Sequence, residues 1–348
     1  LFDASAGFGG YKESGFGREG GREGMMEYLV PAWQKRAKAL PAAKAIAAPV
    51  PVAEMGAGAA FDRTVKLYVG GKQVRPDSGY SYPVLDPKGR VIIEAGLGNR
   101  KDIRNAVEAA HKAEGWANMT GHQRAQVLYF LAENLELRAE EFTSRLVQCG
   151  ASSANAKCEF AASVARIMFY AAWADKYDGA VRGPASRMLA LALKEPYEVL
   201  AISCPNEAPL LGFISLVMPA IAMGNRVVVT PSPNQPLSAC DFYQAVDTSD
   251  VPGGVINIVT GDRDTLADTL AKHDDVGAHW YFGSADGSKK VEAASAGNLK
   301  LTWVNNGLAR DWHDPAQGQG GEFLFKATRV KNIWTPFGVL PNAGSGSY

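Results

Sequence analysis

The stretch LLGFISLVMPAIAMGNRVVVTP, residues 210–231, changes character partway along. Its first part is apolar over the length of a buried helix and closes at Gly224, whereas NRVVVTP is short, rich in valine and typical of a buried strand. The apolar run from Pro209 to Met223 contains Pro219 and is shorter than the about 20 residues that a membrane span needs. The stretch therefore predicts a helix and a strand of one buried core, with no membrane as a partner.

The same alternation continues on both sides of this stretch. RMLALALKEPYEVLAIS, which precedes it, predicts two strands around a turn. The segments that follow are LSACDFYQAV (237–246, helix), VINIVTG (255–261, strand), RDTLADTLAKH (263–273, helix) and AHWYFGS (278–284, strand). Strands that alternate with helices favour right-handed βαβ units around a parallel sheet. We therefore expect an α/β fold, a Rossmann-like parallel sheet with flanking helices, with ligand sites at the carboxyl ends of the strands.

The remaining segments divide the chain into four parts. Residues 1–30 are Gly-rich and then helical, and residues 31–60 are rich in Ala, Pro and Gly, as linkers are. Residues 61–310 open with two strand–turn–strand patterns, the first turning at Gly70 and Gly71, and continue with amphipathic helices before the alternating region. Residues 311–348 begin polar and Gly-rich, continue with the single strand pattern ATRVKNIWTPFGV and close with NAGSGSY, which is typical of a flexible tail.

Composition narrows the classes of function. The chain has 348 residues, 47% of them hydrophobic, with 36 basic and 36 acidic residues, so it can bury sizeable cores and carries no net field that would attract nucleic acid. The four cysteines lack zinc spacing and the five histidines are scattered, so we expect no metal site. Few cysteines and no visible signal peptide predict a cytoplasmic protein.

Several motifs in order resemble the coenzyme-binding half of the aldehyde dehydrogenase superfamily. They are KLYVGGKQV with PVLDPKGRVI, EGWANMTGHQRAQVLYFLAENLELRAEEF, GNRVVVTPSPNQPLSA, VPGGVINIVTG, YFGS and NLKLTWVNNG. A second stretch, FGGYKESGFGREGG at residues 8–21, resembles the end of the catalytic domain of the same superfamily. An end followed by a beginning is similar to aldehyde dehydrogenase family 16, in which two modules follow each other and the second is incomplete. The resemblance implies that this chain is the C-terminal part of a longer polypeptide.

The resemblance also implies which residues stand at the catalytic positions. Such an enzyme needs a thiolate nucleophile, an oxyanion donor and a general base. Asn206 in SCPNEAP stands near the oxyanion-donor position, although a turn Asn in a loop before Pro209 is an equal alternative. Val304 stands where the family has its general-base Glu, and valine moves no proton. The family's Gly-Gln-x-Cys nucleophile has no counterpart, and we expect all four cysteines to be buried structural residues, including Cys204 near the Asn206 loop.

The positions for the coenzyme are changed as well. In the family a Lys and a Glu after the VVV strand hold the adenosine ribose, and here they are Thr230 and Pro233. Gly283 and Ser284 match the pyrophosphate turn, with the second glycine displaced to Gly287. A helix N-terminus there could hold a phosphate, but a tight turn without a ligand is the favoured alternative.

Three hypotheses follow. In the first, residues 61–310 form a non-catalytic module that binds no coenzyme and supports an active upstream module. In the second, the whole polypeptide oxidises aldehydes with NAD or NADP at an upstream site. In the third, the chain is a stand-alone pseudoenzyme or a regulatory module that binds a nucleotide at Gly283 and Ser284. The strand pattern near the C-terminus resembles the strand with which aldehyde dehydrogenases join a neighbouring sheet, which predicts a homodimer, with an ordinary edge strand as the alternative.

Overall fold

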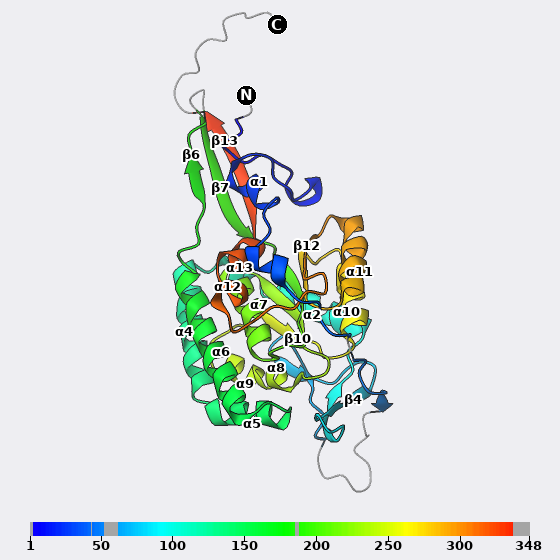
Figure 1. Cartoon of the computed structure of the whole chain (residues 1–348). Coiled ribbons are helices and arrows are strands. Elements are labelled where there is room, and N and C mark those ends of the chain that lie inside the picture. Colours follow the sequence, from blue (N-terminus) through cyan, green and yellow to red (C-terminus); the bar gives the residue numbers. More distant parts are fainter. Residues whose placement is uncertain (1–2, 43, 52–61, 185–187, 337–348) are drawn as a thin grey trace, which may run out of the picture.

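The computed structural model describes residues 3–42, 44–51, 62–184 and 188–336. Residues 52–60 of the expected linker, the start of the strand pattern at Arg187, and the closing residues 337–348 lie outside the described part. The architecture is a mixed α/β fold with a central sheet, helices on both of its faces and a projecting three-stranded sheet (Figure 1).

Within the described residues, the central sheet has seven strands in the order β12-β11-β8-β9-β10-β2-β3. The first five are parallel, and β2 and β3 form an antiparallel hairpin that turns at Gly70 and Gly71. The bounds are β2 Leu67–Val69, β3 Lys72–Val74, β8 Val199–Ser203, β9 Arg226–Thr230, β10 Ile256–Ile258, β11 Ala278–Tyr281 and β12 Leu301–Val304. The expected parallel sheet is confirmed.

Most of the helices in the described residues cover this sheet, on two faces. Their bounds are α1 Gly21–Met26, α2 Arg100–Lys112, α3 Gly115–Asn118, α4 Gly121–Glu136, α5 Ala139–Gln148, α6 Ser153–Trp173, α7 Leu211–Ala222, α8 Leu237–Asp241, α9 Tyr243–Asp247, α10 Arg263–Lys272, α11 Ala285–Ser295, α12 Pro315–Gly318 and α13 Gly321–Lys326. Leu200 and Ile202 of β8 pack in the cluster that contains α7, whereas Val199 and Ala201 pack with α2 and α10. Successive side chains of a strand point to opposite faces, so β8 is buried on both sides.

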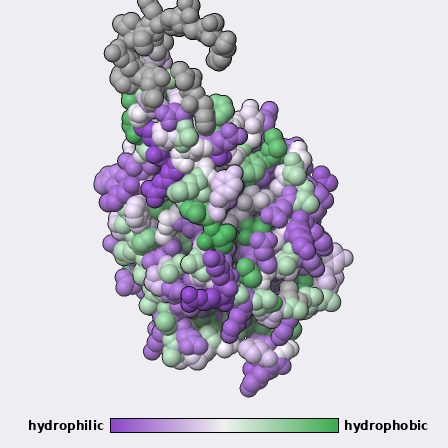
Figure 2. All heavy atoms as spheres, turned by 45° about the horizontal axis from the view of Figure 1, so that its top comes forward, coloured by the Kyte–Doolittle hydropathy of each residue, from purple (hydrophilic) through white to green (hydrophobic). Residues whose placement is uncertain are grey.

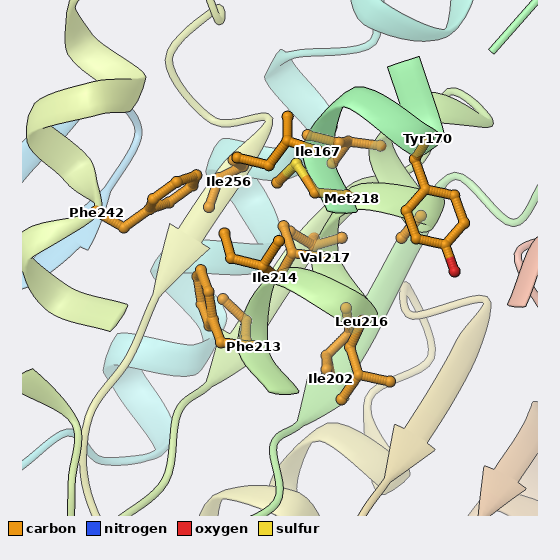
Figure 3. Packing of buried hydrophobic residues seen from close by; sticks show 14 of the residues in the cluster. Ile167, Tyr170, Ile202, Phe213, Ile214, Leu216, Val217, Met218, Phe242 and Ile256 are labelled. Carbon is orange, nitrogen blue, oxygen red and sulfur yellow. The ribbon is translucent and has the colours of Figure 1, made fainter. Parts of the chain in front are cut away.

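The helix α7 is the centre of the larger core. Every residue from Leu211 to Ala222 is buried, as the apolar run predicts. Figure 3 shows Phe213, Ile214 and Met218 of this helix among side chains of α6, β8 and β10. Because the helix is apolar on all sides, it is stable only inside a core of this size.

Two smaller sheets flank the central one. The first contains β1 Val50–Pro51, β4 Tyr80–Leu85 and β5 Val91–Gly96. The second contains β6 Ala180–Arg182, β7 Met188–Pro196 and β13 Thr328–Pro336, and it projects from the body in Figure 1. The strand β13 pairs antiparallel with β7 over its whole length, from Thr328 opposite Pro196 to Pro336 opposite Met188.

The structure corrects two expectations about elements. The helix expected over LSACDFYQAV is two short helices, α8 and α9, which are separated at Phe242. The region after Arg310 contains α12 and α13 before its strand, not a strand alone. Asp314 caps α12 with its side chain and α12 begins with Pro315, but each helix is too short for its apolar period to stand out in the sequence.

Candidate functional site

The residues predicted from the sequence gather at the carboxyl ends of four neighbouring parallel strands. Asn206 follows β8, Thr230 ends β9, Gly283 and Ser284 follow β11, and Val304 ends β12. The register places Ser203 of β8 between Thr230 and Tyr281, and Tyr281 beside Val304. The sheet therefore brings together the loops that form the ligand crevice of doubly wound folds.

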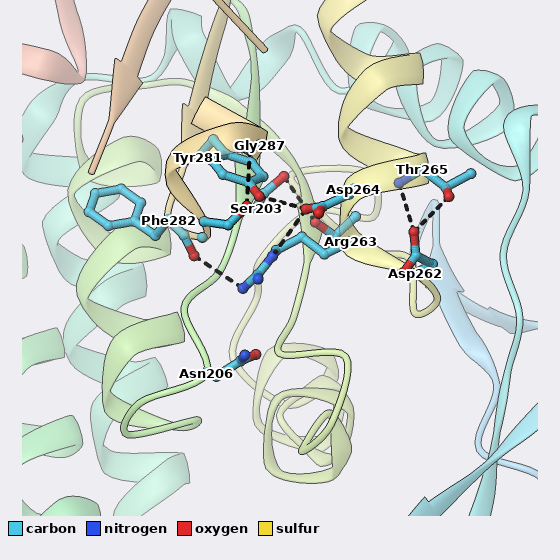
Figure 4. Close-up of polar contacts among 12 residues, drawn as sticks. Ser203, Asn206, Asp262, Arg263, Asp264, Thr265, Tyr281, Phe282 and Gly287 are labelled. Atoms are coloured by element: carbon cyan, nitrogen blue, oxygen red, sulfur yellow. Dashed lines mark hydrogen bonds and ion pairs between the residues drawn. The ribbon is translucent and has the colours of Figure 1, made fainter. Parts of the chain in front are cut away.

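Asn206 takes part in a hydrogen bond between two of these loops. Its Oδ1 accepts from the hydroxyl of Ser232 at 3.1 Å, and the same hydroxyl accepts from the backbone N–H of Gln235. Figure 4 shows Asn206 apart from the polar cluster around Arg263 and Tyr281. In this arrangement its side chain joins the loop after β8 to the loop after β9.

The two residues expected at the ribose positions are buried. The Thr230 hydroxyl donates to the carbonyl of Ile202 and to Ser203 Oγ, at 3.3 and 3.2 Å. Its side chain is buried within the sheet, and Pro233 is buried in the following loop. Neither residue offers a charged group, so the charge-assisted hydrogen bonds that a Lys and a Glu could supply are missing at these two positions.

The turn at Gly283 and Ser284 has partners within the chain. The N–H of Gly283 donates to Asn305 Oδ1 at 3.0 Å. Ser284 caps α11, because its Oγ accepts from the N–H of Gly287 at 3.0 Å. Both N–H groups would have to leave these partners to bind a phosphate.

The Tyr281 phenol fills the space over this turn. A Cβ added to Gly287 would lie 1.9 Å from the phenol oxygen, and one added to Gly283 would lie 2.4 Å from it. The phenol donates to Asp264 Oδ1 at 2.5 Å, and burial together with this carboxylate raises the pKa of Tyr281. The phenol therefore stays protonated at neutral pH and occupies the glycine-lined surface of the turn.

Arg263 connects the loop after β8 to the loop after β11. Its Nη1 donates to the carbonyls of Cys204 and Phe282, at 3.1 and 3.2 Å, and its guanidinium lies 5.6 Å from the centre of the Tyr281 ring (Figure 4). Arg263, Tyr281 and Asn305 were not predicted as site residues. Tyr281 and Asn305 lie in the motifs YFGS and NLKLTWVNNG, but neither these motifs nor the Asp262 cap of α10 indicates where the three side chains point.

The positions expected for a general base and a thiolate nucleophile carry no side chain that could take these roles. Val304 is half-buried and packs against the cluster that contains Tyr281. Burial raises the pKa of the Cys204 and Cys240 thiols far above neutrality and that of Cys149 to about 11, so these three stay protonated. The expectation that all four cysteines are buried is wrong for Cys158, which is exposed because it lies off the buried stripe of α6; its Sγ is 4.0 Å from His313 Nδ1.

Neither a metal site nor a membrane-spanning helix is found in the described part of the chain. No group of three or more His, Cys, Asp or Glu side chains there could hold a metal ion. None of the helices in the same residues is long and apolar enough to cross a bilayer.

Comparison with known proteins identifies the family. Residues 74–307, two thirds of the chain, match the model of the aldehyde dehydrogenase family. The chain is similar to aldehyde dehydrogenase family 2 member C4 of Arabidopsis thaliana, with 32% identity over 68% of this chain and 48% of the relative. It is also similar to an aldehyde dehydrogenase of Agaricus bisporus, with 32% identity over 80% of this chain and 55% of the relative. The chain spans about half the length of these curated relatives.

Solved structures agree with this match. The NAD-dependent aldehyde dehydrogenase of Sinorhizobium meliloti is 26% identical, with a TM-score of 0.66 over 69% of this chain and 49% of that one. A 3,6-anhydro-L-galactose dehydrogenase solved in complex with NAP has the same identity and TM-score over 69% of this chain and 51% of that one. From the match to the family model and the parallel sheet that carries its motifs, we conclude that the chain belongs to the aldehyde dehydrogenase family.

Proposed function

We propose that this chain is the C-terminal part of a two-module aldehyde dehydrogenase of the family 16 type, and that residues 61–310 form a non-catalytic module within it. The upstream module oxidises aldehydes to acids with NAD or NADP in the cytoplasm, and the present module supports it by packing and by joining a second subunit. The order of motifs supports two modules, because an end-like motif at residues 8–21 precedes the coenzyme-half motifs.

The side chains at the carboxyl ends of the strands are the observation that supports a non-catalytic module. Val304 stands at the general-base position, Thr230 turns into the sheet, and the Tyr281 phenol fills the glycine turn. Each change alone would weaken one step of the chemistry. Together they remove the base, the ribose contacts and the open phosphate turn.

Support for an upstream partner comes from residues 3–30. Tyr28, Leu29 and Val30 are exposed by 87%, 54% and 63%. Consecutive exposed apolar side chains of this kind are typical of a surface that packs against another body. Figure 2 shows hydrophobic side chains (green) scattered among mostly hydrophilic ones (purple) on the face turned toward the reader.

The same segment is fastened to the projecting sheet by side-chain contacts. Arg18 donates to the carbonyl of Val330, and Trp334 Nε1 donates to the carbonyl of Gly7 at 3.2 Å. Arg182 pairs with the buried Glu23 at 3.0 Å. These contacts hold the end-like motif beside β13 and so favour a supporting role for this sheet.

The test uses the longer polypeptide with its upstream module, after its denatured intact mass has been measured. Asn206→Ala and Ser232→Ala remove the same hydrogen bond from its two sides, so the two variants are matched. We expect both to keep aldehyde turnover within about twofold of the parent, because an inter-loop hydrogen bond outside the reacting centre contributes only about 1 kcal/mol to stability.

The alternative makes a different prediction for the same pair. If Asn206 were an oxyanion donor, its loss would lower kcat by about 10²–10³, whereas Ser232→Ala would leave kcat nearly unchanged. A large drop for Asn206→Ala alone would contradict catalytic silence. An intact mass near that of residues 1–348 alone would contradict the two-module arrangement.

A further inference from the structure

The segment after residue 31 makes backbone contacts with the crevice. We call residues 32–42 and 44–51 the strap. Leu40 N–H donates to the carbonyl of Gly307 at 2.7 Å, and Ala309 N–H donates to the carbonyl of Lys38 at 2.8 Å. These two bonds flank Ala39, which lies opposite Leu308 as an antiparallel pair. The strap thus adds a short strand to the loop that follows β12.

A second anchor lies at the loop after β9. Asn234 Nδ2 donates to the carbonyl of Lys44 at 3.2 Å. Ile46 packs against the cluster of Tyr82 and Leu237, and Val50 pairs with Ser81 of β4. This end of the strap therefore lies beside Pro233 in the loop after β9, and together they line a cavity of about 380 Å³.

The two anchors lie on either side of the crevice. In the sheet order, β12 and β9 lie on either side of β11 and β8, so the two anchored loops follow strands that flank the strand ends where a doubly wound fold binds its dinucleotide.

The start of the strap is held by an aromatic cluster. Trp33 lies with its ring centre 4.6 Å from the guanidinium of Arg310, which is also within 5.7 Å of the ring centres of Trp303, Trp312 and Phe323. The Arg310 side chain is almost fully buried and pairs with Glu322 at 3.2 Å. A buried guanidinium between rings fixes the strap where it enters the crevice.

The loop that the strap pairs with is itself seated on the glycine turn. Gly307 has a φ of +70°, and a Cβ at this position would lie 2.8 Å from the backbone nitrogen of Ala285. Asn305 of the same loop accepts from Gly283 N–H. The strap, the loop after β12 and the start of α11 therefore form successive layers, and a phosphate group would have to separate them.

From these contacts we propose that the crevice at the carboxyl ends of β8, β9, β11 and β12 is a peptide-binding site, and that its ligand is the strap of this same chain. Recognition is by added-strand hydrogen bonds at residues 307–309, by the Asn234 amide and by the contact of the Trp33 ring with Arg310. Docking of the strap does not depend on whether an upstream module oxidises aldehydes, so this inference goes beyond the proposed function.

A disulfide trap tests the proposal in the full chain. Ala39→Cys with Leu308→Cys places two thiols at a directly opposed antiparallel pair, a geometry that a disulfide can bridge. Ala45→Cys with Leu308→Cys is the matched control, since residue 45 follows the far anchor. Both pairs are made with Cys158→Ser, because Cys158 is the exposed native thiol. Oxidised glutathione is the oxidant, and peptide mass mapping without reductant detects the cross-link.

We expect the 39–308 cross-link to form at least about tenfold faster than the 45–308 one, at a rate that millimolar NAD⁺ or NADP⁺ leaves unchanged. Equal rates for the two pairs would overturn the proposal, and so would slowing of the 39–308 cross-link by either nucleotide. Hydrogen exchange on the unmodified chain gives a second measurement that needs no variant. Slow exchange in peptides covering residues 38–40 and 307–309 is expected, and unprotected amides there would also overturn the docked strap. Neither result depends on the turnover assay of Asn206→Ala.

Discussion

Gly287 lies in the first turn of α11, directly against the Tyr281 phenol, and this contact gives a test of the filled turn. Gly287→Ala alone is expected to destabilise the fold by about 1–3 kcal/mol, because the new Cβ would lie 1.9 Å from the phenol oxygen and 2.4 Å from Cζ. With Tyr281→Ala the same change is expected to stabilise the helix by about 0.5–1 kcal/mol, since alanine favours helix over glycine. Urea unfolding of the four proteins gives this cycle, and an equal effect of Gly287→Ala in both backgrounds would contradict the filled turn.

His279 is expected to make the stability of the fold depend on pH. Its ring is fully buried in β11, Nε2 lies 3.1 Å from Ser203 Oγ, and burial, with Lys300 nearby, lowers the pKa of His279 from 6.5 to about 3. The unfolded chain therefore binds a proton below about pH 6.5 that the folded chain does not bind until about pH 3. Stability is expected to fall as the pH drops through this window, by up to about 1.4 kcal/mol per pH unit.

Two variants separate this group from the other titrating residues. His279→Gln removes the titration, so its loss of stability between about pH 6.5 and about pH 5 should be smaller than that of the parent. His122→Gln is the control, because it replaces a histidine that is exposed on α4. Equal slopes for His279→Gln and the parent, measured by urea midpoints, would show that His279 is not the cause.

At the scale of elements, β13 of the projecting sheet is expected to take part in oligomerisation. Its pairing with β7 covers one edge, and Arg18 and Trp334 bring residues 7–18 to it by side-chain contacts. Deleting residues 330–336 is expected to change the oligomeric state, because β13 is an edge strand, the kind of element best able to join another sheet. Sedimentation velocity measures this, and Ile333→Asp, at a partly exposed position of β13, is a milder variant with the same expected direction. An unchanged sedimentation profile for both would refute the role.

Some of these elements could be predicted from the sequence and others could not. The parallel strands and α7 were predictable, since periodicity and apolar runs directly express burial. The break at Phe242 and the short helices α12 and α13 were not, because tertiary contacts rather than local propensity stabilise elements of four to six residues. At the site, the positions of Thr230 and Val304 followed from motif order. The Tyr281 phenol and the Arg263 hydrogen bonds did not, since they depend on side-chain directions across separate strands.

At the scale of the whole molecule, the closed crevice predicts how the chain responds to coenzyme. A ligand that binds only the folded state raises stability by RT ln(1 + [L]/Kd). For a Kd of about 10 mM, about 1 mM NAD⁺ would add only about 0.06 kcal/mol, which no melting experiment resolves. A retained site with a Kd of about 10 μM would add about 2.7 kcal/mol, which for a chain of this length is a rise in Tm of about 4 °C.

We therefore expect NAD⁺ and NADP⁺ to leave the Tm of the full chain unchanged within about 0.5 °C. The control is the chain with the 39–308 disulfide, in which the strap cannot leave the loop after β12. If the nucleotide raised the Tm of the reduced protein but not of the cross-linked one, the crevice would still be a coenzyme site that the strap covers reversibly. No shift in either protein is the expected result, because Thr230, Pro233 and the Tyr281 phenol would leave the dinucleotide without its partners even where the strap had moved aside.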